Sequence, residues 1–134
     1  MKKINKLDNF RFVCVGGKED EGSWKYISSR LDFVPESLIN KTSIFDLTMI
    51  IRKADYFIGV DSGPANIAHL ADTRSVVLYG PGPHMFMSHH SDDIAIDKSG
   101  GRGLLNLYFS MPNSYISRIT VDEVFDAFQN LYAK

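Results

Sequence analysis

Short apolar runs alternate along the chain with segments in which apolar residues recur every three or four positions. Runs rich in β-branched and aromatic residues are typical of buried strands, and the wider spacing is typical of amphipathic helices. We expect strands at residues 10–15, 37–40, 56–60, 75–79 and 94–96. We expect helices at residues 21–31, 44–53, 65–71 and 121–132.

Two of these helices start with a capping box, in which a hydroxyl residue is followed three positions later by an acidic one. The pairs are Ser43 with Asp46 and Thr120 with Glu123. Because strands and helices alternate along the chain, we predict an α/β fold with a Rossmann-like parallel sheet and helices on both of its faces.

The composition is that of a globular protein, with 44% hydrophobic and 23% charged residues. Residues 1–9 are polar and are expected to form a flexible lead-in, and residues 10–134 a single domain. A net charge of -1 leaves no basic excess for a polyanion, so we expect no nucleic-acid partner. Cys14 is the one cysteine, which excludes an intramolecular disulfide and suits a reducing compartment. No apolar run is long enough for a transmembrane segment, and we predict a soluble, cytoplasmic protein.

The segment Asp61-Ser62-Gly63-Pro64 follows a predicted strand directly and opens a predicted helix. Ligands of α/β proteins bind beyond the carboxyl ends of the strands, and free amides at a helix start bind phosphate. Gly63 lets a phosphate approach the backbone closely, and Ser62 offers a hydroxyl. Pro64 is expected at the first helical position, where its missing N–H costs nothing. Gly80-Pro81-Gly82 follows the next strand and is expected to line the same crevice.

These residues resemble glycosyltransferase family 9, the heptosyltransferase family of lipopolysaccharide synthesis. The resemblance runs from about residue 10 to the end of the chain and rests on several motifs. They are Val15-Gly16-Gly17 with Glu19-Asp20-Glu21, Asn40-Lys41-Thr42-Ser43-Ile44, Asp61-Ser62-Gly63-Pro64 with Ala68 and Ala71, Val76-Val77-Leu78-Tyr79-Gly80-Pro81, and Ile119-Thr120-Val121-Asp122-Glu123-Val124.

The resemblance implies the C-terminal half of a two-domain GT-B enzyme, the half that holds ADP-heptose. It implies that Ser62 and Gly63 contact the diphosphate, that Thr42 lies beside the adenosine, and that Asp20 or Glu21 bonds the ribose hydroxyls. It calls for no metal and no cofactor. The residues expected to bind the nucleotide sugar are Asp20, Glu21, Lys41, Thr42, Asp61, Ser62, Gly63, Pro64, Asn66, Gly80 and Gly82.

The sequence departs from the family pattern in three ways. The acceptor-binding half, which carries the general base, is missing, together with the first strand and helix of the donor half. Asn66 stands where the family has His, and Gly82 where it has Thr. No catalytic residue is therefore assigned, and glycosyl transfer is expected only with an acceptor domain from another chain. The open sheet edge favours that partner or a homodimer. The alternatives are a non-catalytic nucleotide or nucleotide-sugar binding module and a degenerate interaction protein.

Other polar residues favour structural interpretations. His84, His89 and His90, with Asp92 and Asp93, have no helical metal-ligand spacing, and the adjacent histidines are expected to be solvated. His69 is interpreted as a partly buried helix residue bonded to backbone rather than as a general base. A hydrolase triad of Ser62, Asp61 and His69 is disfavoured because the nucleophile elbow is absent.

Overall fold

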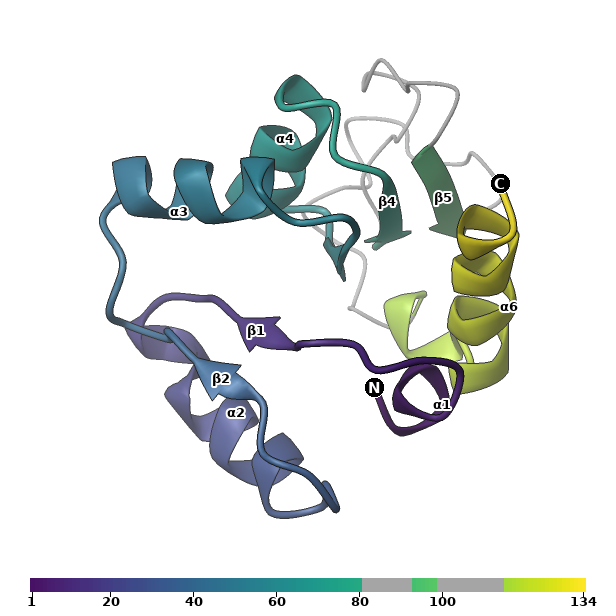
Figure 1. Cartoon of the computed structure of the whole chain (residues 1–134), viewed down its shortest axis with the longest axis horizontal. Coiled ribbons are helices and arrows are strands. Elements are labelled where there is room, and N and C mark those ends of the chain that lie inside the picture. Colours follow the sequence, from purple (N-terminus) through teal and green to yellow (C-terminus); the bar gives the residue numbers. More distant parts are fainter. Residues whose placement is uncertain (81–92, 99–114) are drawn as a thin grey trace. The chain divides into compact units, whose positions relative to one another are not determined.

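The computed structural model describes residues 1–80, 93–98 and 115–134 (Figure 1). Contacts between residues divide the chain into two compact units, Met1–Leu47 and Thr48–Lys134. Both are α/β units with parallel strands, as the alternating pattern predicts. The strand expected at 94–96 is present, whereas residues 81–92 and 99–114 lie outside the described part of the chain.

The first unit contains a parallel pair of short strands, β1 (Val13–Cys14) and β2 (Glu36–Ser37). Backbone hydrogen bonds continue the pairing past both strands, since Leu38 N–H donates to Cys14 O and Asn40 N–H to Gly16 O. A 3-10 turn, η1 (Lys18–Asp20), and helix α2 (Glu21–Ser28) connect the two strands. The strands predicted at 10–15 and 37–40 are therefore present, but each has only two residues in the parallel ladder.

The N-terminal segment of this unit is partly ordered by a single helical turn, α1 (Lys2–Asn5). Ile4 is its one buried side chain. The hydrophobic pattern gave no sign of this turn, because one apolar residue among lysines and asparagines has no period. Helix α3 (Ile44–Arg52) then leads from the first unit into the second. Its start has the predicted capping box, with Asp46 N–H donating to Ser43 Oγ and Ser43 N–H donating to Asp46 Oδ2.

The second unit is built on a three-stranded parallel sheet in the order β3-β4-β5. The strands are β3 (Phe57–Val60), β4 (Ser75–Tyr79) and β5 (Asp93–Asp97). Helix α4 (Gly63–Leu70) connects β3 with β4. The loop between α4 and β4 is fastened to the end of α3, since the buried Thr73 Oγ1 donates to Ile51 O at 3.0 Å.

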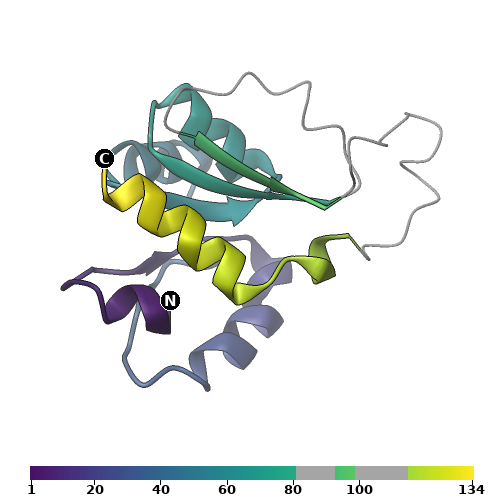
Figure 2. The same cartoon turned by 90° about the vertical axis from the view of Figure 1, so that its right-hand side faces the viewer.

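Helices cover both faces of this sheet, as Figure 2 shows with α4 in teal and α6 (Val121–Tyr132) in yellow. On one face Ala65 of α4 packs with Val77, Tyr79 and Phe57 in a buried cluster. On the other face α6 lies against β4 and β5. Its Phe128 is 2% exposed and packs edge-on against Tyr56, with ring centroids 5.1 Å apart. A buried aromatic side chain of this kind stabilises the fold by about 1.5–3 kcal/mol.

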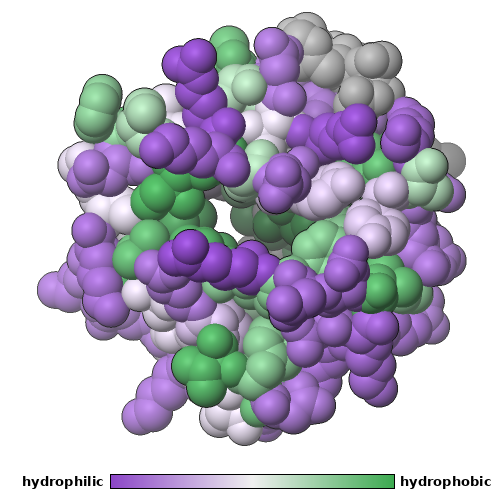
Figure 3. Space-filling view, in the orientation of Figure 1, coloured by the Kyte–Doolittle hydropathy of each residue, from purple (hydrophilic) through white to green (hydrophobic). Residues whose placement is uncertain are grey.

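The visible surface carries hydrophobic side chains in separate groups among hydrophilic ones (Figure 3). Within the described ranges, no helix has the length and apolar character needed to cross a membrane. A further 3-10 turn, η3 (Ile116–Arg118), precedes α6. Thr120 then caps α6 through the predicted capping box with Glu123, so the C-terminal helix agrees with the sequence prediction from its cap to its end.

Candidate functional site

Strand β3 delivers the Asp61-Ser62-Gly63 segment to the carboxyl edge of the sheet. The strand ladder continues one residue past β3, because Asp61 N–H donates to Leu78 O at 3.0 Å. The chain then leaves the sheet at Ser62, which has extended dihedrals (φ -163°, ψ 176°), and enters α4 at Gly63. This is the strand-to-helix turn at which α/β proteins bind their ligands.

Ser62 occupies the N-cap position of α4 without capping the helix through its side chain. Its hydroxyl instead donates to Val60 O at 3.0 Å. Ser62 O accepts from Asn66 N–H at 3.1 Å, which closes the first helical turn. The prediction that Pro64 takes the first helical position is wrong, because Gly63 already belongs to the helix and Pro64 follows it. The second position also needs no N–H within the helix, so proline fits there equally well.

Two backbone donors are left at the start of α4. Pro64 has no N–H, and Gly63 and Ala65 precede the first amide that finds a carbonyl four residues back. Within residues 1–80, 93–98 and 115–134, neither of these two N–H groups has a partner. Both carry the partial positive charge of the helix N-terminus and suit a phosphate. The sequence analysis did not predict Ala65 as a donor, although Pro64 before it indicates a helix start, where amides lack partners.

Glycine at position 63 is not explained by backbone strain or by internal packing. Its φ lies outside the left-handed region, and among the described residues a Cβ placed there meets no atom within 4 Å. The same holds at Gly80, which follows β4 at the same edge of the sheet. Gly59 is different, because a Cβ there would come within 2.6 Å of the Phe57 ring. Open space at both edge glycines is what close approach of a ligand to the backbone requires.

Tyr79, the last residue of β4, packs beneath the first turn of α4 in the buried cluster. Its side chain is 2% exposed and packs in the cluster with Ala65, in the first turn of α4. Burial raises the pKa of the Tyr79 hydroxyl, and the negative charges of Asp61 and Asp93 raise it further. The phenol therefore stays neutral at physiological pH. Asp61 itself is exposed at the turn.

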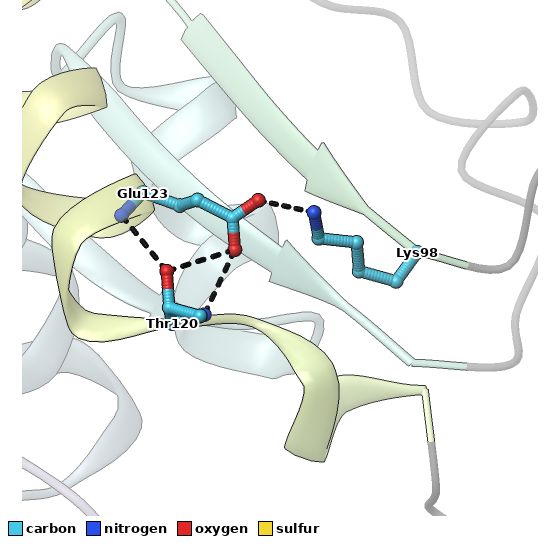
Figure 4. A network of polar contacts seen from close by, with 3 residues as sticks. All are labelled: Lys98, Thr120 and Glu123. Carbon is cyan, nitrogen blue, oxygen red and sulfur yellow. Dashed lines mark hydrogen bonds and ion pairs between the residues drawn. The ribbon is translucent and has the colours of Figure 1, made fainter.

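The start of α6 lies at the carboxyl edge on the opposite face and is closed by side chains (Figure 4). Thr120 N–H donates to Glu123 Oε2 at 2.9 Å, and Glu123 N–H donates to Thr120 Oγ1 at 3.2 Å. Lys98, which follows β5, forms an ion pair with the Glu123 carboxylate. The Lys98 ammonium and the hydrogen bonds from Thr120 lower the pKa of Glu123 to about 2.

The predicted nucleoside-binding residues belong to the first unit. Asp20 Oδ2 accepts from Gly17 N–H at 2.9 Å and so closes the turn after β1. Glu21 Oε1 accepts from Asn40 Nδ2 at 2.9 Å, which brings the segment after β1 together with the segment after β2. In that second segment Lys41 Nζ donates to Ser37 O at 3.1 Å. Thr42 follows it and is partly buried.

The remaining sequence candidates fall into two groups, those outside the described residues and those that the structure describes. Gly82, together with His84, His89, His90 and Asp92, lies outside the described residues. His69 is partly buried, as expected, and its Nδ1 lies 3.1 Å from Asp93 Oδ2. Cys14 is half-buried, and burial raises the pKa of its thiol, which makes the thiol less readily ionised.

Comparisons with known proteins agree with this architecture. The family model described as glycosyltransferase family 9 (heptosyltransferase) matches residues 3–100. A solved structure, the glycosyl transferase family 9 from Veillonella parvula DSM 2008, superimposes with a TM-score of 0.83 at 19% sequence identity. The match covers 96% of this chain and 38% of that one. No curated protein matches the chain.

The parallel sheets and the strand-to-helix turn define an α/β domain with the fold of that solved structure. Since the family match extends over most of its residues, the chain belongs to glycosyltransferase family 9. The chain spans about 38% of the length of the solved family member.

Proposed function

We propose that this chain binds the diphosphate of a nucleotide-sugar donor, of the ADP-heptose kind, at the start of α4. The observation that carries the proposal is the start of α4 itself, where the amides of Gly63 and Ala65 have no partner within the described residues. The open space at Gly63 and Gly80 supports it, because a phosphate can reach the backbone there. The Ser62 hydroxyl is a third donor once it rotates away from Val60 O.

We propose that residues of the first unit contribute to recognition of the nucleoside. Glu21 and Asn40 are hydrogen-bonded to each other, and Lys41 and Thr42 follow directly. The carboxylates of Asp20 and Glu21 each keep lone pairs beyond the bonds described above, and ribose hydroxyls are common donors to such carboxylates. Within the second unit, we propose that Asp61, Pro64 and Asn66 take part in donor binding at the start of α4.

The proposed reaction is transfer of the sugar to an acceptor hydroxyl. The hydroxyl oxygen forms a bond to the anomeric carbon, the bond from that carbon to the phosphate oxygen breaks, and ADP leaves. The acceptor proton goes to a base in an acceptor-binding domain, which we propose lies outside these 134 residues. The amides at Gly63 and Ala65 stabilise the charge that develops on the leaving diphosphate. A homodimer stays a prediction from the sequence, as does a cytoplasmic location.

A second candidate is a module that binds a nucleotide or nucleotide sugar without transferring the sugar. The presence of Asn66 where the family has His favours it, because an amide cannot exchange a proton as an imidazole can. Both candidates need the same donor site, and they differ only in turnover.

Calorimetric titration with ADP, ADP-sugars, UDP-sugars and GDP-sugars tests the proposal. We expect saturable binding of ADP and ADP-sugars, with weaker binding of the other nucleotides. Absence of binding at millimolar concentrations of every ligand would contradict both candidates and leave a packing or interaction role. Release of ADP on addition of an acceptor-domain protein and its acceptor would decide for the transferase.

A further inference from the structure

Helix α4 is attached to the sheet by few apolar groups. Within its eight residues the buried side chains are those of Ala65 and Ala68. Ile67 and Leu70 are its two large aliphatic residues, and Leu70 is 82% exposed. The methyl groups of two alanines bury little apolar surface, so their contribution to stability is small. The fully buried apolar contacts of α4 thus come from two small side chains, and a polar contact can add to what fixes the position of the helix.

A polar cluster joins the last turn of α4 to strands β4 and β5. His69 Nδ1 lies 3.1 Å from Asp93 Oδ2, and the Ser75 hydroxyl donates to Asp93 Oδ1 at 2.7 Å. The side chains of His69 and Asp93 are 16% and 6% exposed. Because an ionised carboxylate only accepts, Nδ1 of His69 is the donor. Asp93 sits between the histidine and the serine, so His69 does not activate the hydroxyl and the cluster is not a nucleophilic triad.

The chemistry of the cluster makes this contact specific. Hydrogen bonds to a charged acceptor are stronger than neutral ones, and a largely buried carboxylate needs its donors. The register pairs Ser75 with Asp93 at the start of the two strands, so both partners of the histidine network are fixed by the sheet. His69 is the member that belongs to the helix, and its bond holds α4 against that fixed edge.

We propose that His69 is a positioning residue that, through Asp93, sets where α4 lies on the sheet and hence where the amides of Gly63 and Ala65 point. Gly63 and His69 are six positions apart, or about 9 Å along a rigid helix. A small rotation of α4 about its C-terminal turn therefore displaces the donors at its start. This inference rests on the proposed donor site and adds to it a residue at the far end of the helix.

The test compares His69→Ala with His69→Asn by calorimetric titration with ADP. The amide nitrogen of asparagine takes the place of Nδ1, so His69→Asn keeps a donor to Asp93 while His69→Ala removes it. We expect the ADP dissociation constant to rise about tenfold in His69→Ala and to stay within about twofold of the original in His69→Asn. Equal affinity in all three proteins, or equal weakening in both variants, would overturn the proposal.

A control separates positioning from general loss of stability. Leu131→Ala removes a fully buried side chain of α6, on the opposite face of the sheet, and destabilises the unit without touching α4. At a temperature where every variant is folded, Leu131→Ala should bind ADP as the original chain does. If it weakens binding as much as His69→Ala, the role of His69 is merely structural and the proposal fails.

Hydrogen exchange gives a readout that needs no ligand. We expect the α4 amides to exchange faster in His69→Ala than in His69→Asn or Leu131→Ala. If the original chain does not bind ADP, the proposed function fails, and hydrogen exchange alone then decides the positioning role. Unchanged exchange in His69→Ala would overturn that role whether or not ADP binds.

Discussion

The starts of α4 and α6 occupy equivalent places in the second unit and differ in how their amides are satisfied. Each helix begins at the carboxyl edge of the same parallel sheet, one on either face. At α6, Thr120 and Glu123 close the helix start with reciprocal hydrogen bonds, and Lys98 neutralises the carboxylate. At α4, Ser62 turns its hydroxyl back to Val60 O and leaves the amides of Gly63 and Ala65 without a partner in the described residues.

This difference separates a helix start that serves stability from one that is suited to a ligand. A helix start gains about 1 kcal/mol from a serine or threonine cap. The α4 start has a serine at the right position and does not use it in this way. An anion that binds there finds donors that no side chain has to release first.

The largest expected effect is on ligand binding, in Gly63→Val. The added side chain fills the open space through which a phosphate reaches the α4 amides, so we expect ADP binding to be lost. The fold should persist, because none of the described residues outside its own helix turn places an atom within 4 Å of a Cβ at this position. Calorimetry measures the binding, and circular dichroism the fold.

Gly22→Val is the matched control for that substitution. Gly22 also lies at a helix start, in α2, and a Cβ there also meets nothing within 4 Å. We expect Gly22→Val to bind ADP normally. Retained binding in Gly63→Val would place the phosphate somewhere other than at the α4 start.

The next effect is on stability, in a pair of cap substitutions. Thr120→Ala removes the N-cap of α6 and should lower the free energy of unfolding by about 1 kcal/mol. Ser62→Ala removes a hydroxyl that does not cap the helix, and should lower the free energy of unfolding by only about a few tenths of a kcal/mol. Urea unfolding of both variants measures the two values.

The order of these two values is the informative result. A loss in Ser62→Ala as large as that in Thr120→Ala would mean that Ser62 stabilises α4 after all. The contrast between the two helix starts would then disappear.

A smaller effect concerns acid stability. The pKa of Glu123 falls from its ordinary 4.5 to about 2 in the folded chain, because Lys98 and Thr120 bond the ionised form. The stabilisation is therefore complete above about pH 4.5 and is lost as the pH falls toward 2. In Lys98→Met the strongest of these bonds is gone, so the stabilisation from Glu123 should be smaller, and its loss, which still begins near pH 4.5, should be complete at a higher pH. Acid unfolding at fixed ionic strength measures the shift, and equal acid profiles for both proteins would contradict it.

Local sequence patterns predicted the capped helices better than the open one. The capping boxes at Ser43 and Thr120 are short-range signals, since both partners lie within one helical turn, and both are confirmed. Asp61-Ser62-Gly63-Pro64 is as local, but the direction of the Ser62 hydroxyl depends on the carbonyl of Val60 in β3. The sequence of this four-residue motif was therefore compatible both with a side-chain cap by Ser62 and with a turn whose amides bind a ligand.

Long-range contacts explain most of what the sequence did not predict. His69 and Asp93 are 24 residues apart and meet only because α4 packs on the sheet that includes β5. Nothing in the pattern around either residue indicates the pair. The β1 and β2 strands were expected to be longer because their apolar runs are longer than the ladder that the two strands form. The α/β architecture itself depends only on alternation, which the pattern shows clearly.

The central claim, that the start of α4 receives the diphosphate, is tested most directly by following backbone amide NMR signals during an ADP titration. We predict that the signals of Gly63 and Ala65 shift most, while those of Val121 to Glu123 at the closed α6 start stay in place. Shifts concentrated at the α6 start, or none at Gly63 and Ala65 with millimolar ADP, would contradict the claim.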